Sequence, residues 1–322
     1  MREILSELRE WTDAGEEIAL ATVVETWGSS PRPIGSKMAV TRSGKMAGSV
    51  SNGCIEGAVF EEGQKVLKAA RGRIAAFGVA DDVAFEVGLA CGGHIEVYVE
   101  PFGETHRKVL AMLEKNEPAT LRTNLVSGEL ELVEGTATGS ELPRRDGDWF
   151  VEPYRRAAHL VIVGAIHIAI PLHRLAKLMG YRVTVIDARA KFATHERFPE
   201  ADELVVAWPD EAMSRIRLDP STYVVILTHD PKFDLPALRS VLGKDVGYIG
   251  AIGSRKTNQN RFDKLRAEGY TEQQLARVHG PIGLDLGSRG ADETALGIIA
   301  EVTAERYGGS GAGMKQVKAA TG

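Results

Sequence analysis

Cysteine is scarce in this chain, with two residues, Cys54 and Cys91, among 322. They do not form a CxxC pair, which argues against a disulfide framework or a zinc ribbon, so both are expected to be reduced thiols. Long hydrophobic runs are also missing: the longest, LVIVGAIHIAIPL at residues 160–172, is shorter than the roughly 20 residues that a membrane helix needs. The N-terminus lacks the apolar core of a signal peptide. We therefore expect a cytoplasmic protein without membrane contact.

An excess of positive charge is absent as well. The net charge is -5, with 43% hydrophobic and 26% charged residues. This balance gives no overall basic field of the kind that nucleic-acid binding needs. It is ordinary for a globular protein of about two domains, and we expect no nucleic-acid partner.

The first half of the chain alternates helical and strand patterns irregularly, which predicts an α+β domain over residues 1–153. The expected strands are EIALATVVET, two short strands in KMAVTRSGKMAGSV, GRIAAFGV, GGHIEVYVEP and a hairpin in PATLRTNLVSGELELVEG. The expected helices include EGAVFEEGQKVLKAARG and THRKVLAMLEKN. The arginine-rich segment 139–157 is interpreted as a polar linker that ends this domain.

From His159 onward, near-continuous Val and Ile runs alternate with helical segments. Such runs are typical of a parallel sheet covered on both faces. We therefore predict an α/β protein in which the N-terminal α+β domain is followed by a Rossmann-like domain with a parallel sheet, at residues 158–308. The small, polar residues 309–322 are expected to form a mobile tail.

The segment GAIHIA, at Gly164 to Ala169, follows a strand and opens a helix, and Asp187 ends the next strand. This spacing suits an acidic side chain that binds a ribose. However, Ile166 occupies the position of the second glycine of the dinucleotide fingerprint, where a side chain obstructs the approach of a pyrophosphate. Whether this domain binds a nucleotide therefore stays open.

Polar clusters follow three of the predicted parallel strands, where ligands of open α/β sheets bind. They are Asp187 with Arg189, then Thr228-His229-Asp230, then Gly253-Ser254-Arg255-Lys256. The third cluster opens a helix, and its free amides and two cations suit an anion. Helix capping by Ser254 alone is the alternative for that cluster, but three clusters on one edge favour a binding site.

Two glycine-rich motifs of the first half carry the cysteines: Asn52-Gly53-Cys54-Ile55-Glu56, and Cys91-Gly92-Gly93-His94. A third segment, GSSPRPIG, contains Arg32 as its only charge. A cysteine is often a small buried residue, but these two adjoin glycines. A helix N-terminus also favours the thiolate, the form that binds metal or attacks sulfur.

In order along the chain, TVVETWGSSPRPIGSKMAV, GSVSNGCIEGAV and CGGHIEVYVEP resemble the N-terminal domain of the XdhC/CoxI family. LVIVGAIHIA, VTVIDARAKFATHERFP, VVILTHDPKFDLPAL, YIGAIGSRKT and PIGLDLGSRGADETALGIIAEV resemble its Rossmann domain. The resemblance runs from about Ile18 to Tyr307. One departure is Gly164-Ala165-Ile166-His167, where the family usually has GAGH.

The resemblance implies an accessory protein without its own turnover. Such a protein binds molybdenum cofactor (molybdopterin), protects it while a cysteine desulfurase adds the terminal sulfur, and inserts it into an apo molybdenum hydroxylase of the xanthine or carbon monoxide dehydrogenase type. The resemblance also suggests a homodimer. The candidate cofactor-binding residues are Arg32, Cys54, Glu56, Cys91, Gly92, Gly164, His167, Asp187, His229, Asp230, Ser254, Arg255 and Lys256. Cys54 and Cys91 are the candidates for contact with the metal.

Two other functions are compatible with parts of the sequence. One is an NAD(P)-dependent oxidoreductase, against which Ile166 argues and which leaves the cysteine motifs unexplained. The other is a nucleotide-binding regulatory protein. Calorimetry with NAD, NADP, ATP and FAD would separate this third function from the other two.

Overall fold

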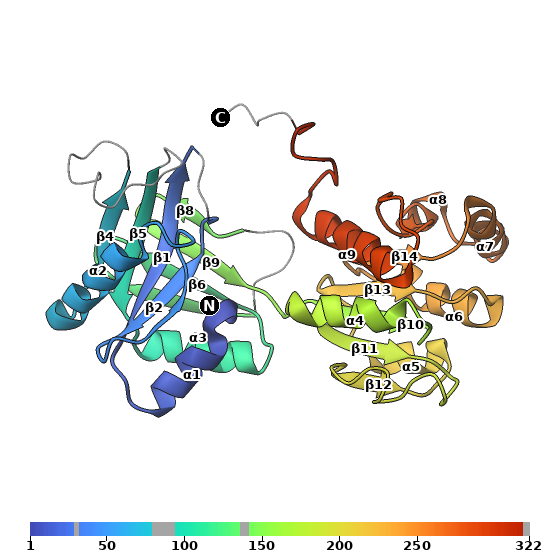
Figure 1. Ribbon diagram of the computed structural model, residues 1–322, viewed down its shortest axis with the longest axis horizontal. Coiled ribbons are helices and arrows are strands. Elements are labelled where there is room, and N and C mark those ends of the chain that lie inside the picture. The colour runs from blue at the N-terminus through green and yellow to red at the C-terminus, as the bar shows by residue number, and fades with distance from the viewer. Residues whose placement is uncertain (29–31, 79–93, 136–141, 318–322) are drawn as a thin grey trace. The chain divides into compact units, whose positions relative to one another are not determined.

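The computed structural model describes residues 1–28, 32–78, 94–135 and 142–317. The chain divides into two compact units, Met1–Arg156 and Ala157–Gly322, whose elements are labelled in Figure 1. Within the described ranges, no helix combines the length and apolar character that crossing a membrane requires.

The first unit contains an antiparallel five-stranded sheet of order β3-β2-β1-β5-β4. Its strands are β1 (Ile18–Trp27), β2 (Lys37–Thr41), β3 (Met46–Gly48), β4 (Arg73–Phe77) and β5 (His94–Pro101). Its helices are η1 (Arg2–Ile4), α1 (Leu5–Asp13), α2 (Glu56–Ala69) and α3 (Glu104–Glu114). The strands and helices expected from the sequence form at these places.

Strand β1 is buried on both faces, and its alternate residues serve two cores. Ala19, Ala21 and Val23 pack with the apolar face of α2. Ile18 and Leu20 belong to a second cluster that includes residues of α1 and α3. Helix α2 is therefore fixed against the sheet, and with it the segment that leads into its N-terminus.

A second sheet of the first unit has the order β7-β6-β9-β8. It consists of β6 (Ala119–Asn124), β7 (Leu130–Glu134), β8 (Arg144–Asp146) and β9 (Trp149–Tyr154). The predicted hairpin is confirmed as β6 and β7. The interpretation of segment 139–157 as a linker is wrong for β8 and β9, because β9 pairs with β6 and buries Phe150 and Tyr154.

The second unit is built on a six-stranded sheet of order β12-β11-β10-β13-β14-β15, and every pairing is parallel. The strands are β10 (His159–Val163), β11 (Arg182–Ile186), β12 (Glu203–Val205), β13 (Thr222–Ile226), β14 (Tyr248–Ala251) and β15 (Val278–His279). The helices are α4 (Ala169–Leu178), α5 (Pro209–Arg215), α6 (Pro231–Leu242), α7 (Arg255–Ala267), α8 (Glu272–Leu275) and α9 (Ala291–Tyr307). The predicted α/β fold with a parallel Rossmann-like sheet is confirmed.

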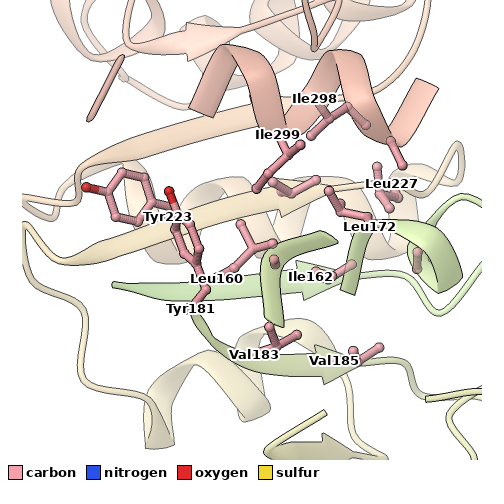
Figure 2. Packing of buried hydrophobic residues seen from close by; sticks show 14 of the residues in the cluster. Leu160, Ile162, Leu172, Tyr181, Val183, Val185, Tyr223, Leu227, Ile298 and Ile299 are labelled. Atoms are coloured by element: carbon pink, nitrogen blue, oxygen red, sulfur yellow. The ribbon is translucent and has the colours of Figure 1, made fainter. Parts of the chain in front are cut away.

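The two faces of this sheet hold separate cores. On one face Leu160 and Ile162 pack with Leu172 of α4 and Ile298 of α9, as Figure 2 shows. On the other face Val161 belongs to a cluster that includes apolar residues of α5, α6 and α7. Burial on both faces explains why these strands read as continuous apolar runs.

Candidate functional site

The segment that carries Cys54 begins at one end of the five-stranded sheet of the first unit. Strand β1 ends at Trp27, which pairs with His94 at the start of β5, and their rings lie 5.0 Å apart. Strand β3 ends at Gly48, beside the start of β2. Because neighbouring strands are antiparallel, the ends of β1 and β3 and the start of β5 lie at the same end of the sheet. Cys91 and Gly92 lie outside the described residues.

The loop between β3 and α2 is organised by the Glu56 carboxylate. Its Oε1 accepts hydrogen bonds from Ser49 Oγ (2.5 Å), Val50 N (3.2 Å) and Ser51 N (2.8 Å). Its Oε2 accepts hydrogen bonds from Ser51 Oγ (2.5 Å) and Gly53 N (2.8 Å). Burial opposes ionisation of Glu56, but these hydrogen bonds outweigh burial and lower its pKa to about 2.

Cys54 stands on this loop as an exposed free thiol. It directly precedes Ile55, the N-cap of α2, which is fully buried and donates its backbone N–H to Ser51 Oγ at 2.9 Å. Asn52 and Gly53 adopt positive φ angles of 56° and 110°. The turn therefore buries Ile55 and leaves the thiol in solvent, so Cys54 is not a core residue.

Arg32, the cation expected to bind an anion, has a partner within the first unit. Its Nη2 lies 2.5 Å from Glu3 Oε2. Glu3 is largely exposed, and an anionic ligand at Arg32 has to compete with that carboxylate.

In the second unit, the three predicted polar clusters follow β11, β13 and β14 and so lie at the carboxyl edge of the parallel sheet. Asp187 is 2% exposed. Its Oδ2 accepts hydrogen bonds from Ala165 N (2.9 Å) and Arg189 Nη2 (2.8 Å), and its Oδ1 accepts two more from Arg189. Burial opposes ionisation, but these bonds outweigh it and lower the pKa of Asp187. The carboxylate is thus already occupied where a ribose hydroxyl would bind.

The turn after β10 is shaped by close packing. Gly164 has a φ of 105°, and a Cβ atom there would lie 2.6 Å from Thr228 Cγ2. Ile166 packs against the core of the sheet, while His167 is exposed. Gly164 therefore allows β10 and β13 to approach each other at this edge, whatever ligand binds there.

Two of the predicted binding residues cap helices. Ser254 Oγ accepts a hydrogen bond from Thr257 N at 3.1 Å and caps α7. Asp230 accepts one from Lys232 N and caps α6. The side chains of His229, Arg255 and Lys256 are exposed, so they stay accessible to a ligand.

The sequence did not reveal a buried ion pair beneath this edge. Arg261 Nε lies 3.0 Å from Asp234 Oδ2, and both side chains are almost fully buried. Arg261 also donates to the carbonyl oxygens of Thr228 and Ile252, which follow β13 and β14. Helical spacing in the sequence could have indicated that Arg261 is buried, because Asn258, Arg261 and Leu265 share one face of α7.

Family models match both units. Residues 160–302 match the XdhC Rossmann domain, and residues 11–78 match the XdhC and CoxI family. The chain belongs to the XdhC/CoxI family.

Relatives of this XdhC/CoxI chain span most of its length. It is similar to a probable xanthine dehydrogenase subunit of Bacillus subtilis, with 26% identity over 316 residues, covering 90% of this chain and 94% of the relative. It is also similar to the molybdenum cofactor insertion chaperone PaoD of Escherichia coli, with 29% identity over 296 residues, covering 91% of this chain and 85% of PaoD.

A crystal structure described as a xanthine dehydrogenase from Bacillus halodurans shares the fold of this XdhC/CoxI chain. The TM-score is 0.77 at 23% identity, covering 94% of this chain and 95% of the other.

Among the residues that the structure describes, no group of three or more His, Cys, Asp or Glu side chains could hold a metal ion. Cys54 offers one soft thiol donor among the described residues of this XdhC/CoxI chain. The predicted metal contacts of Cys54 and Cys91 stay predictions.

Proposed function

We propose that this chain is a molybdenum-cofactor chaperone for a hydroxylase of the xanthine or carbon monoxide dehydrogenase type. It binds the cofactor as cargo, protects it while a cysteine desulfurase adds the terminal sulfur, and inserts it into the apo-enzyme, acting as a homodimer. Family membership supports this function, and so does the similarity to PaoD, which is named a molybdenum cofactor insertion chaperone.

The observation that carries the proposal is the exposed Cys54 thiol on a loop fixed by hydrogen bonds. Thiolate sulfur is a soft ligand and suits molybdenum better than the hard oxygen ligands around it. In the proposal Cys54, together with Cys91, contacts the metal end of the cofactor. Arg32, in the same unit, is the candidate for its anionic groups.

The geometry of Asp187 gives no support to an NAD(P)-dependent oxidoreductase. Its carboxylate is buried and bonded to Ala165 and Arg189, whereas ribose recognition in such enzymes uses an accessible carboxylate at this place. At Ile166 the chain also lacks the glycine that allows a close approach of the backbone to a pyrophosphate.

The test is to purify wild type, Cys54→Ser and Cys54→Ala from a molybdenum-replete host and measure bound molybdenum and pterin together with the melting temperature. Because Cys54 is exposed, both variants should keep the wild-type stability within about 0.5 kcal/mol. Their cofactor content should fall strongly, because neither an alcohol nor a methyl group is a good ligand for a soft metal.

Met46→Leu serves as the matched control, since it removes another exposed sulfur of the first unit. It should retain the cofactor as wild type does. Full retention by both Cys54 variants would show that this thiol does not hold the cargo.

A further inference from the structure

Three aromatic rings, two of them exposed, lie at the carboxyl edge of the parallel sheet. They belong to the segments that follow β11, β12 and β13. Phe192 follows β11, Trp208 follows β12, and Phe233 lies in the first turn of α6 after β13. Because all three strands are parallel, their carboxyl ends meet at one edge. Trp208 is 48% exposed and Phe192 is 38% exposed.

These rings form one continuous surface with Arg189. Trp208 and Phe233 stack with centroids 4.9 Å apart and an interplanar angle of 19°. The guanidinium carbon of Arg189 lies 4.2 Å from the Phe192 centroid and 5.5 Å from the Phe233 centroid. We call the surface made by Arg189, Phe192, Trp208 and Phe233 the aromatic edge.

Single exposed apolar side chains are common on protein surfaces and need no function. Here the large rings are grouped with a planar cation at the edge where open α/β sheets bind their ligands. Phe192, Trp208 and Phe233 belong to neither of the two buried clusters of this sheet.

The aromatic edge is held in place before any ligand binds. Arg189 gives Nε and Nη2 to the buried carboxylate of Asp187, at 2.8 Å each. A fixed guanidinium plane loses little side-chain entropy when a ring stacks on it.

Cations also lie on this surface. The guanidinium carbon of Arg197 lies 5.4 Å from the Phe192 centroid, and its Nη1 donates to the Phe192 carbonyl at 2.7 Å. Lys191, which precedes Phe192 in the sequence, is exposed. Each guanidinium has five N–H donors, and the internal partners named here use only some of them. The remaining donors suit an anionic substituent on a stacked ring.

We propose that the aromatic edge binds a planar heteroaromatic ring that carries a phosphate group. Aromatic side chains and guanidinium planes accept such rings by stacking, and cations accept the phosphate. Both nucleotides and phosphorylated pterins have this chemistry. The proposal does not depend on Cys54, and it does not require a pyrophosphate to bind at the turn that holds Ile166.

The experiment is calorimetric titration of the full chain with AMP, CMP and neopterin monophosphate. Ribose 5-phosphate, which has the phosphate but no aromatic ring, is the ligand control. At least one ring-bearing ligand should bind about tenfold more tightly than ribose 5-phosphate, because stacking adds to the phosphate contact. Binding of AMP or CMP alone would identify a nucleotide as the ligand, and binding of neopterin monophosphate alone would identify a pterin.

Trp208→Leu and Phe192→Leu should each weaken the binding of that ligand about tenfold, since each removes a stacking face. Tyr307→Leu is the matched control: Tyr307 is 65% exposed and also carries an arginine, Arg306, at 5.0 Å from its ring centroid. Arg306 contacts Tyr181, which precedes β11, so this pair lies at the opposite edge of the sheet.

The control variant should bind as wild type does. The proposal is overturned if no ring-bearing ligand binds more tightly than ribose 5-phosphate, or if both Leu variants at the aromatic edge keep wild-type affinity. Neither result bears on cofactor retention by the Cys54 variants, which tests the chaperone function separately.

Discussion

Replacing Glu56 by Gln tests whether this carboxylate organises the loop that carries Cys54. The substitution keeps the shape of the side chain but exchanges one oxygen for an NH2 group. The two carboxylate oxygens accept hydrogen bonds from donors on Ser49, Val50, Ser51 and Gly53. In the variant the NH2 group faces donors, so at least one backbone N–H loses its acceptor.

The size of the effect follows from the pKa. The hydrogen bonds lower the pKa of Glu56 from 4.5 to about 2, a difference of 4.5 - 2 = 2.5. At about 1.36 kcal/mol per pKa unit this sets an upper limit of about 3.4 kcal/mol. Because the side chain is only partly buried, solvent screening reduces the expected contribution to about 1–2 kcal/mol.

The sign of the pH dependence is determined by the lowered pKa. The folded state holds Glu56 ionised more strongly than the unfolded state does, so its contribution is fully present above pH 4.5 and is lost as the pH falls towards 2. The stability difference between wild type and Glu56→Gln should therefore be about 1–2 kcal/mol at pH 7 and should shrink in acid.

Denaturant unfolding at several pH values measures this difference, and amide hydrogen exchange at Ser51 and Gly53 reports the loop directly. Glu61→Gln, an exposed glutamate on the same helix, is the matched control and should change neither quantity. The reasoning is refuted if Glu56→Gln matches this control, or if its stability deficit does not vary with pH.

The same change also tests the link from the loop to the cargo. If Glu56 acts by placing Cys54, Glu56→Gln should lower cofactor retention in the wild-type background and have no further effect in Cys54→Ser. Equal losses in both backgrounds would show that Glu56 does not act through the thiol.

Three further outcomes are expected. Arg261→Met should cost about 3–5 kcal/mol in denaturant unfolding because it leaves the Asp234 carboxylate buried without its cation. Arg266→Met, which breaks exposed pairs on the same helix, should leave the unfolding midpoint close to that of wild type. Burial lowers the pKa of His159 from 6.5 to about 4, so wild-type stability should fall as the pH drops through this window, and His159→Gln should lessen that fall. Calorimetry should find weak NAD binding by wild type and tighter binding by Ile166→Gly; tight binding by wild type would contradict the role given to this side chain.

The sequence by itself determined the class of fold and most of its elements, β8 and β9 excepted. Near-continuous apolar runs such as HLVIV and TYVVI predicted strands buried on both faces, and they form β10 and β13 of a parallel sheet. The sequence also predicted that a helix starts just after Cys54, and α2 begins there. These features depend on how apolar residues are spaced along the chain, and the sequence shows that spacing directly.

Only the tertiary structure decided which side chains become partners. The Asp187 contact with Ala165, the Arg261 contact with Asp234 and the stack of Trp208 on Phe233 each join residues more than twenty positions apart. The polar segment with Arg144 and Arg145 became a strand because β9 pairs with β6 and β8 pairs with β9. Strand order and helix packing bring these residues together, and no local pattern in the sequence records that order.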